Sequence, residues 1–460
     1  MSNKTQKYEI RDVIHGLIER SSLEVKIINT PVFQRLRRIR QLALAHLVYP
    51  GAHHTRFEHC LGTMHIAGRI AEKLKEDGNL SDNDVENIRL AALLHDIGHG
   101  PFSHVSEYLL EKYYDPDNAD IGQEREKIHE IVTKDIIQKN PDLKKLIPEQ
   151  QRNDIVTLLN KAGIKDFKGD IVSGPLDADK LDYLLRDNYH TGVKYGLYDL
   201  DKIIESLRVI RFGHEESFLG IDEEGIYALE QLIMAKYHMT TQVYFHRIRG
   251  ITDSMTIRGI ELAVNEGLDE VKNLYTYDGS DVFLKRYYSY HDESLMSLIQ
   301  KNGGPLSKKI FERLHNRKLF KLVHSRRVSE IEGAKLKDKY SDLNTNDALK
   351  RELEKKIAEK LKTNPEFVII KIVDIKNPIW SPQGYSIKDQ TILVKLKDKP
   401  DKEAEQIGDI KWSIFNFKGG FGSPEIQVYA PYDALTDMHG EKREKEKEKI
   451  DDIVAKILYK

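Results

Sequence analysis

The chain contains little cysteine and little tryptophan, with one Cys and two Trp among 460 residues. One cysteine cannot form an intrachain disulfide, which excludes a disulfide-stapled secreted framework and fits a reducing compartment. No stretch approaches the roughly 20 apolar residues that cross a bilayer, and the opening MSNKTQKYEIRD lacks the apolar core of a secretory signal. We therefore expect a cytoplasmic protein with no membrane partner, in which Cys60 is a small core residue.

An excess of charge of one sign is also absent. Seventy-two basic residues against 74 acidic residues give a formal net charge of −2, so nucleic-acid binding is not implied and any anion site must be local. Hydrophobic residues at 40% and charged residues at 32% are typical of a folded chain. Its length allows one large catalytic body and an appended lobe.

Apolar spacing predicts a mainly α fold. Helical patterns cover residues 31–49, 57–78, 81–97 and 224–264, and Pro101 is placed to open a further helix. We expect an α-helical catalytic core over 1–280 and a smaller mixed α+β C-terminal lobe over 281–460 that serves packing or oligomerisation.

Strand patterns are few. A pair is predicted within 208–222, where Gly213 supplies the turn, and β-branched runs recur beyond residue 280 among charged helices such as 347–362. These runs lie at 318–323, 366–375, 389–397 and 424–430.

The stretch AALLHDIGHGPFSH places three histidines and an aspartate in an otherwise apolar segment. Burying an ionised carboxylate beside imidazoles is costly unless a cation compensates it, and a divalent metal binds carboxylate and neutral histidine together. His95 and Asp96 are adjacent and cannot surround an ion alone. His59 in HHTRFEHCLG and Asp179 in DADKLDYLLRD are the candidates for further metal ligands.

The order His59, His95–Asp96, Asp179 resembles the H…HD…D signature of the HD phosphohydrolase superfamily. Together with NTPVFQRLRRIRQL, RFEHCLG and LLHDIGHGPFSH, it is most similar to the deoxynucleoside triphosphate triphosphohydrolases of that superfamily. The resemblance covers about residues 8–249, apart from 113–170. It implies one divalent metal per subunit, with Fe, Mn, Zn, Ni and Mg all open, and further Mg or Mn could accompany the nucleotide.

The spacing of Arg56, Lys180 and Tyr183 from the predicted ligands lets all three reach one metal-centred pocket. The resemblance implies a fuller set of substrate contacts. Relatives carry arginine where Lys236 stands, and Tyr244 is equally well interpreted as a core aromatic. The implied contacts are Arg56, Lys180 and His99 to the phosphates, Tyr183 and Gln41 to the sugar, Asp187 to the sugar edge, Leu42 beneath the nucleoside, and Lys236 and Tyr244 further along the chain.

Cleavage at the α-phosphorus leaves a nucleoside 5′-oxygen, which needs a proton. His104, Glu107 and His129 are the candidates to deliver it, and Glu107, three residues after His104, could instead orient His129. The role of His129 rests on the resemblance, because without the resemblance His129 would be interpreted as a surface histidine.

The resemblance also implies a homo-oligomer, dimer or tetramer, with activating nucleotides bound between subunits. Asn29 departs from the aspartate that reads guanine in the mammalian enzyme, and an amide offers a different set of donors and acceptors. The matching positions are Asn29, Gln34, Arg37, Lys202 and His246.

Three functions remain from the sequence. The first is hydrolysis of a dNTP to deoxynucleoside and triphosphate. The second is an HD phosphohydrolase acting on monophosphates, alarmones or nucleic-acid ends, which need not keep Gln41, Leu42 and Tyr183. The third is a non-hydrolysing nucleotide sensor or nucleic-acid-binding protein, which the basic stripe Arg35–Arg40 keeps open.

Overall fold

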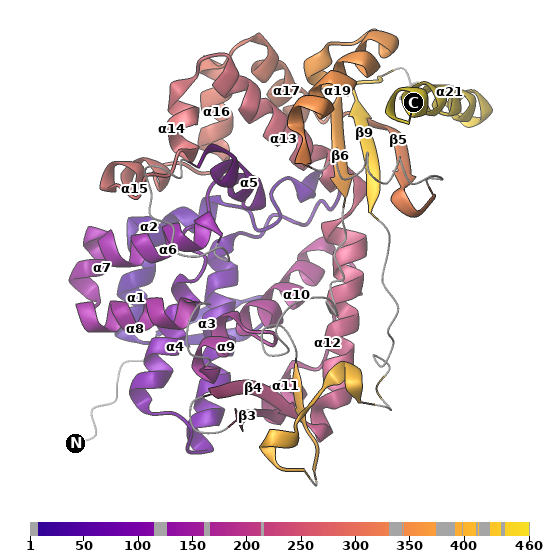
Figure 1. Ribbon diagram of the computed structural model, residues 1–460. Coiled ribbons are helices and arrows are strands. Elements are labelled where there is room, and N and C mark those ends of the chain that lie inside the picture. Colours follow the sequence, from indigo (N-terminus) through magenta and orange to yellow (C-terminus); the bar gives the residue numbers. More distant parts are fainter. Residues whose placement is uncertain are drawn as a thin grey trace. The chain divides into compact units, whose positions relative to one another are not determined.

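The computed structural model describes residues 8–114, 127–160, 166–212, 216–330, 343, 345–373, 392–397, 399–410, 413, 424–433 and 438–459. They form two compact units (Figure 1). The first unit draws on Met1–Gln242, Glu270–Leu295 and Ile379–Lys418, and the second on Val243–Asp269, Met296–Pro378 and Gly419–Lys460. The chain thus passes between the units repeatedly, and the division near residue 280 stays a prediction. No helix in the described ranges is both long and apolar enough to cross a membrane.

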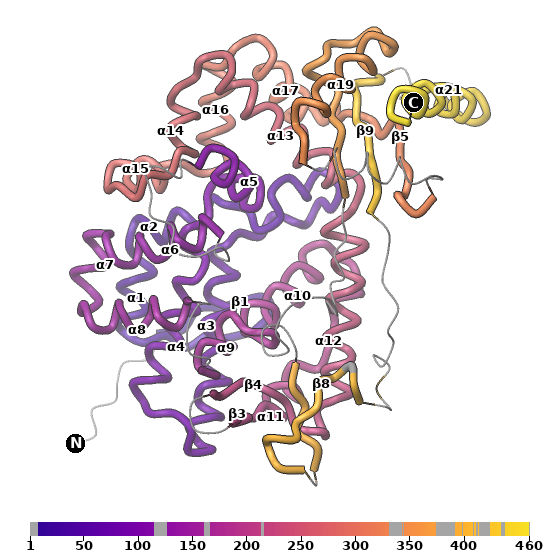
Figure 2. The backbone as a smooth tube through the Cα atoms, in the orientation of Figure 1, coloured from indigo at the N-terminus to yellow at the C-terminus, as the bar shows by residue number. Residues whose placement is uncertain are grey.

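The first unit is mainly helical, as predicted. Figure 2 traces its backbone. Its helices are α1 (Ser22–Ile28), α2 (Pro31–Gln34), η1 (Arg35–Arg38), η2 (Ala45–Leu47), α3 (Arg56–Glu76), α4 (Asp82–Leu94), α5 (His104–Tyr113), α6 (Ile128–Lys139), α7 (Pro141–Leu146), α8 (Glu149–Leu159), α9 (Phe167–Ser173), α10 (Ala178–Thr191), α11 (Leu200–Ser206), α12 (Ile226–Met239), most of α14 (Asp269–Tyr275) and α15 (Asp281–Tyr287), while α16 (Asp292–Asn302) runs from this unit into the second.

Two small sheets accompany these helices. The hairpin of β1 (Tyr8–Asp12) and β2 (Gly16–Arg20) is not among the predicted elements. A second sheet has the order β3-β4-β7-β8, built from β3 (Leu207–Phe212), β4 (Glu216–Asp222), β7 (Leu393–Lys395) and β8 (Glu405–Gln406). The predicted pair within 208–222 is confirmed as antiparallel β3 and β4; the turn assigned to Gly213 lies outside the described residues.

Helix α3 is the centre of the first unit. Its sequence is apolar on most sides, so Cys60, Met64, Ala67 and Ile70 are completely buried, with α4 and α10 packed against it. A capping box of Thr55 and Glu58 starts the helix by satisfying its first amides. This packing brings the start of α3, the end of α4 and the start of α10 together.

Residues 31–49 do not form the single helix that their apolar spacing predicts. The segment divides into α2, η1 and η2, with Ile39 extended at φ −115° and ψ 108°. Hydrogen bonds to a neighbouring segment replace the helical ladder, since Arg56 N donates to Ile39 O at 3.0 Å and Gln41 N donates to His54 O at 3.1 Å. These hydrogen bonds between segments outweigh the helical spacing of the apolar residues in 31–49.

Two further helix boundaries differ from the prediction. Pro101 does not open α5, which begins at His104, because Phe102 and Ser103 have positive φ angles of 62° and 53°. The long helix predicted over 224–264 is divided into α12 and α13 by a π-helical stretch, Thr240–Tyr244.

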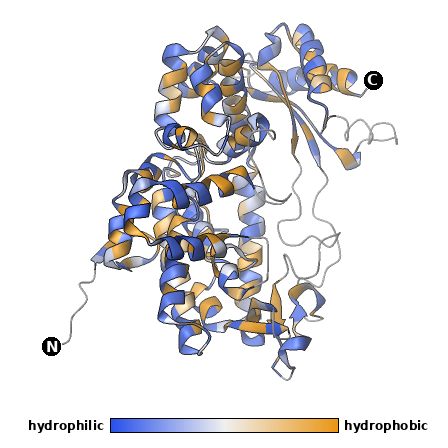
Figure 3. Cartoon of the chain, turned by 60° about the vertical axis from the view of Figure 1, so that its left-hand side comes forward, coloured by the Kyte–Doolittle hydropathy of each residue, from blue (hydrophilic) through white to orange (hydrophobic). Residues whose placement is uncertain are grey.

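The second unit combines helices with one antiparallel sheet, in agreement with the predicted α+β character of the C-terminal part. The sheet order is β5-β9-β6, and its core includes Ile357, Val428 and Val454. Most helices in Figure 3 carry both hydrophobic and hydrophilic stretches, as expected for helices with one buried side. The elements are α13 (Arg247–Asn265), α17 (Pro305–His315), β5 (Lys321–Arg327), α19 (Asp347–Leu361), β6 (Ile369–Val373), β9 (Glu425–Ala430) and α21 (Gly440–Leu458).

Candidate metal centre and active site

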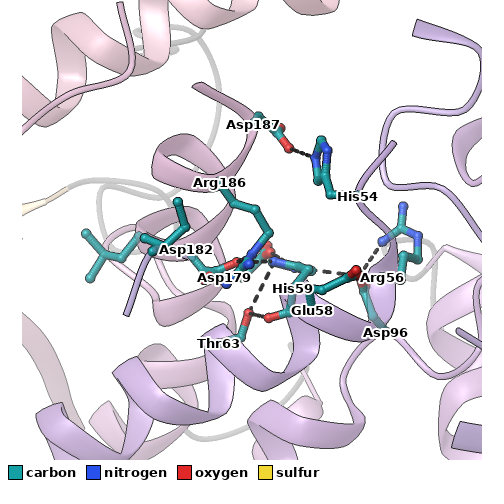
Figure 4. A network of polar contacts seen from close by, with 12 residues as sticks. His54, Arg56, Glu58, His59, Thr63, Asp96, Asp179, Asp182, Arg186 and Asp187 are labelled. Carbon is teal, nitrogen blue, oxygen red and sulfur yellow. Dashed lines mark hydrogen bonds and ion pairs between the residues drawn. The ribbon is translucent and has the colours of Figure 1, made fainter. Parts of the chain in front are cut away.

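Three of the four predicted metal ligands converge in the first unit. One donor atom from each of His59, His95 and Asp96 lies within 4.8 Å of the other two. Asp179, in the first turn of α10, places Oδ1 at 3.0 Å from His59 Nε2 and 3.7 Å from His95 Nε2. Residues 120 positions apart in sequence therefore meet at one point (Figure 4).

The donor set fits a divalent cation. The Nε2 atoms of His59 and His95 are buried and make no hydrogen bond to any described residue, although carboxylates surround them. Burial lowers the pKa of His59, but Asp179 and Asp182 outweigh it and raise that pKa. The carboxylates thus attract positive charge onto the imidazole, and a metal ion would supply that charge to two nitrogens and two carboxylates at once.

Asp182 is a part of this site that the sequence analysis missed. It is fully buried and holds His59 Nδ1 at 2.8 Å, His15 Nε2 at 2.7 Å and the Arg186 guanidinium at 2.8 Å. Arg186 in turn donates to Asp12 at 2.8 Å. Because Asp182 fixes Nδ1, the opposite nitrogen of His59 faces the other donors, as for a histidine that binds metal. Its position three residues after Asp179 was the available signal.

Arg56 begins α3 beside the metal donors and is 2% exposed. Its Nη1 bonds Asp96 Oδ2, its Nε donates to Ser103 Oγ at 2.9 Å, and its Nη2 is buried with no hydrogen-bond partner among the described residues. His99 places Nε2 at 3.2 Å from Asp96 Oδ1. Burial and the nearby Arg56 charge lower the pKa of His99 to about 4.

The two predicted phosphate lysines occupy different environments. Lys180 Nζ donates to Gly174 O at 2.9 Å and forms an ion pair with Asp177, so this ammonium already has partners. Burial and the charge of Lys180 lower the pKa of Lys236 to about 8.

The predicted acid and base residues form a second cluster. His104 Nδ1 is 3.2 Å from Glu107 Oε2, and His129 Nδ1 is 3.6 Å from the same oxygen. The rings of His99 and His129 stack at 4.2 Å, which joins this cluster to Asp96. His104 is exposed, whereas His129 is buried and its pKa is lowered by burial and by His99. Glu107 also pairs with Lys127.

The predicted sugar contacts lie on neighbouring segments. Gln41 N donates to the carbonyl of His54, and His54 Nε2 is 2.7 Å from Asp187 Oδ1, which is completely enclosed (Figure 4). Gln41 Oε1 is buried without a hydrogen-bond partner in the described part of the chain. Burial and the carboxylate of Asp179 raise the pKa of Tyr183, and Leu42 is 3% exposed.

Three of the predicted activator residues share one corner. Asn29 ends α1, Gln34 Nε2 donates to Ile28 O at 2.8 Å, and Gln34 Oε1 accepts from Arg37 Nε at 2.9 Å. Lys202 lies on α11 of the same unit.

The remaining two predicted positions, Tyr244 and His246, belong to the second unit. There Arg249 lies over the Tyr244 ring at 5.6 Å, and His246 caps α13 through Ile248 N at 3.2 Å.

Comparisons with known proteins agree with this geometry. Residues 56–184 match the HD domain and residues 198–399 match the HD associated region. The uncharacterized protein MJ1154 of Methanocaldococcus jannaschii is 37% identical over 68% of this chain, and the chain spans only 65% of that relative. The deoxynucleoside triphosphate triphosphohydrolase SAMHD1 of Gallus gallus is 27% identical over 91% of this chain and 71% of its own.

A solved structure has the same fold. A phosphohydrolase from Bacteroides thetaiotaomicron superposes with a TM-score of 0.69 at 24% identity, covering 92% of this chain and all of its own. The matched HD domain, residues 56–184, contains His59, His95, Asp96 and Asp179. The chain thus carries an HD domain followed by an HD associated region, and it has the fold of a solved phosphohydrolase.

Proposed function

We propose that this chain is a metal-dependent triphosphohydrolase that cleaves deoxynucleoside triphosphates to deoxynucleoside and triphosphate. The observation that carries the proposal is the convergence of His59, His95 and Asp96 donor atoms within 4.8 Å, beside the Arg56 guanidinium. The similarity to SAMHD1, a deoxynucleoside triphosphate triphosphohydrolase, supports the choice of substrate.

His59, His95, Asp96 and Asp179 would hold the metal. Held by these four residues, a divalent ion would supply a Lewis acid that polarises a phosphoryl oxygen and lowers the pKa of bound water. The choice among Fe, Mn, Zn, Ni and Mg stays open, since imidazole and carboxylate suit all of them to some degree. Asp182 keeps the His59 ring in the orientation that this binding needs.

The cationic side chains around the proposed metal ligands would bind the triphosphate. Arg56 Nη2 is the strongest candidate, because a buried guanidinium nitrogen without a hydrogen bond is costly until an anion accepts from it. Lys180 and Lys236 add charge, and Lys180 would exchange its bond with Asp177 for one with a phosphate oxygen. His99 lies close enough to Asp96 to join them.

Protonation of the leaving 5′-oxygen is assigned to the cluster around Glu107. The lowered pKa values of His99 and His129 make both rings neutral at pH 7 in the free protein. A polyanionic substrate raises the pKa of nearby imidazoles, so the proton would be taken up with the substrate. Glu107, at 3.6 Å from His129 Nδ1, stabilises the imidazolium that results; His104 is the exposed alternative.

Selection of deoxyribose is assigned to Gln41, Leu42 and Tyr183. A closed apolar wall at Leu42 would leave a ribose 2′-hydroxyl without a partner, which costs about 1–3 kcal/mol. Asp187 acts at the edge of this pocket by holding His54, whose carbonyl fixes the backbone of Gln41.

Regulation by a second nucleotide belongs to the same proposal. Gln34 and Arg37 are hydrogen-bonded to each other beside Asn29 at the end of α1, and in a homo-oligomer Lys202 and His246 from different subunits would add contacts. Preincubation with GTP and with dATP should separate a guanine-specific activator from others, since Asn29 offers a mixed amide edge.

The test is a turnover assay with each dNTP and rNTP, with and without Mn²⁺, that follows inorganic triphosphate. We expect triphosphate from dNTPs only. We also expect a loss of about 10²–10³-fold in kcat for Asp179→Asn, the range for removing one electrostatic group from a reaction centre. The matched control is Asp201→Asn, an exposed aspartate on α11 paired with Arg69. Release of pyrophosphate or monophosphate instead would contradict the proposed reaction.

A further inference from the structure

A strained turn lies between the HD residues and α5. Phe102 and Ser103 have φ angles of 62° and 53°, and both are completely buried. Such backbone conformations cost about 1–3 kcal/mol for residues other than glycine and persist only where surrounding contacts enforce them. The contacts that enforce this turn therefore indicate what it is for.

Asp292 holds the turn from one side. Its Oδ1 accepts from Phe102 N at 2.7 Å and its Oδ2 accepts from Arg40 N at 3.0 Å. The carboxylate is fully buried, and the guanidinium of Arg40 approaches no closer than 3.8 Å. Two backbone amides thus provide its main stabilisation, which ties the turn to the segment before α3.

The hydroxyl of Ser103 makes the second attachment. It donates to Arg40 O at 2.7 Å and accepts from Arg56 Nε at 2.9 Å. A hydroxyl has one proton, so the bond to the carbonyl leaves its oxygen free to accept from the arginine. With Nη1 on Asp96, two of the three Arg56 nitrogens are fixed and Nη2 is the one that remains.

We infer that Ser103 is a positioning residue for Arg56. Its hydroxyl orients the guanidinium so that Nη2 faces the anionic triphosphate while Nη1 stays on Asp96. This rests on the proposed function, in which Arg56 binds phosphate. Without the hydroxyl the guanidinium loses a fixed orientation, and triphosphate binding has to include the cost of ordering it.

Substitution of Ser103 by glycine separates this role from a structural one. Glycine adopts positive φ without strain, so Ser103→Gly removes the hydroxyl and relieves the backbone. If the serine were only structural, the Tm could move but the affinity for triphosphate would not. We expect the Kd for inorganic tripolyphosphate and the KM for a dNTP to rise about tenfold, with a smaller change in kcat, because one charge-assisted contact is misoriented.

The control is Ser106→Ala. This neighbouring serine is also completely buried, and its hydroxyl donates to Pro101 O rather than contacting Arg56. It should lower the Tm and leave the tripolyphosphate Kd unchanged. In an Arg56→Ala background, Ser103→Gly should have no further effect on Kd, as expected when one residue acts through the other.

The Kd for tripolyphosphate is measured by calorimetry in the presence of Mn²⁺. This measurement does not require hydrolysis, so it tests the role of Ser103 independently of the proposed reaction. A wild-type protein that binds tripolyphosphate and hydrolyses no dNTP would overturn the function alone. Unchanged Kd in Ser103→Gly, or no tripolyphosphate binding by the wild type, would overturn the role of Ser103.

Discussion

At the scale of single residues, the site depends on buried charges that satisfy one another. Asp182 contacts His59, His15 and Arg186 at once, and Arg186 continues to Asp12. Removing one member of such a network leaves the other charges buried and unpaired. The position of His59, a proposed metal ligand, thus depends on Asp182, which is not among the proposed ligands.

Asp182→Asn keeps the shape of the side chain and removes its charge. We expect a 10- to 100-fold loss in metal affinity, because the partner of His59 Nδ1 is weakened, and a loss of about 3 kcal/mol in unfolding free energy. Metal analysis after dialysis and urea denaturation would measure the two effects. A variant that retains wild-type metal content and stability would refute the orienting role; Asp201→Asn again serves as the control.

His65 on α3 makes stability depend on pH. Burial, together with His15, Arg69 and Arg89, lowers the pKa of His65 to about 4, against about 6.5 in the unfolded chain. Between these two pH values only the unfolded state binds the proton. The contribution of His65 to the free energy of unfolding is therefore fully present above pH 6.5 and is lost as the pH falls toward 4.

The size of this loss is on the order of 1 kcal/mol, after allowance for solvent screening of a partly exposed ring. His65→Gln should flatten the stability profile between pH 7 and pH 5, measured by urea denaturation in EDTA so that metal release does not contribute. The exposed His439 provides the comparison, and equal profiles for His439→Gln and His65→Gln would contradict the assignment.

Single residues were predictable from the sequence where their role is marked by a short motif, and not where it depends on contacts between distant segments. The four metal ligands lie in short motifs, and the structure brings their atoms together; their role as ligands stays a prediction. Asp182 could have been found from its position three residues after Asp179, whereas the contact of Ser103 with Arg56 arises from packing between segments 47 residues apart and leaves no local pattern. Serine in HGPFSH indicates neither a positive φ nor a bond to Arg56.

At the scale of elements, helix α3 contains two glycines, Gly62 and Gly68, that lie against different neighbouring side chains. A Cβ at Gly62 would lie 1.8 Å from Asp182 Oδ1 and 2.4 Å from Arg186 Nη2, whereas one at Gly68 would meet the flexible end of Arg89 at 2.3 Å. Gly62 therefore permits the close approach of α3 to α10, whereas the neighbour of Gly68 is the partly exposed guanidinium of Arg89, which pairs with Glu24.

These two positions give a matched pair of substitutions. Gly68→Ala should change stability by less than about 1 kcal/mol, because the better helix propensity of alanine offsets the shift of Arg89 against its partner Glu24. Gly62→Ala should destabilise by about 3 kcal/mol or more, because the buried ion network must break. Thermal unfolding of both variants checks this, and equal Tm values would show that α10 accommodates the methyl group.

Secondary structure was predictable where a periodic pattern coincides with strong boundary signals. α3, α19 and the β3–β4 pair follow the sequence closely. Residues 31–49 have helical spacing, yet tertiary hydrogen bonds to the segment before α3 hold Ile39 extended. The hairpin β1–β2 is too short and too charged for its alternation to stand out.

At the scale of the whole molecule, each unit has its own core and its own buried ion pairs. In the second unit Arg258 Nη2 donates to both oxygens of Glu354 at 2.9 Å, and Glu354 Oε1 accepts from Ile370 N at 2.9 Å. One carboxylate therefore joins α13, α19 and β6.

Glu354→Gln should destabilise the second unit by about 3 kcal/mol, because Arg258 keeps a buried charge without a full counter-charge. We expect faster amide hydrogen exchange in α13, α19 and β6, with unchanged protection in α3 and α10, since local stability follows local contacts. The control is Glu352→Gln, an exposed residue on the same helix paired with Lys356. Uniformly faster exchange in all five elements would show that the two units unfold together.

The interleaved chain course sets an order of assembly during synthesis. The segments that bring the metal donors together, α3, α4 and α10, have all been translated by residue 191. Helix α13 begins only at residue 247, and the strands β6 and β9 of the same unit end at residues 373 and 430, so the sheet of the second unit is complete only near the end of translation. The donor residues of the proposed metal site can thus come together on the ribosome long before the last sheet of the second unit closes.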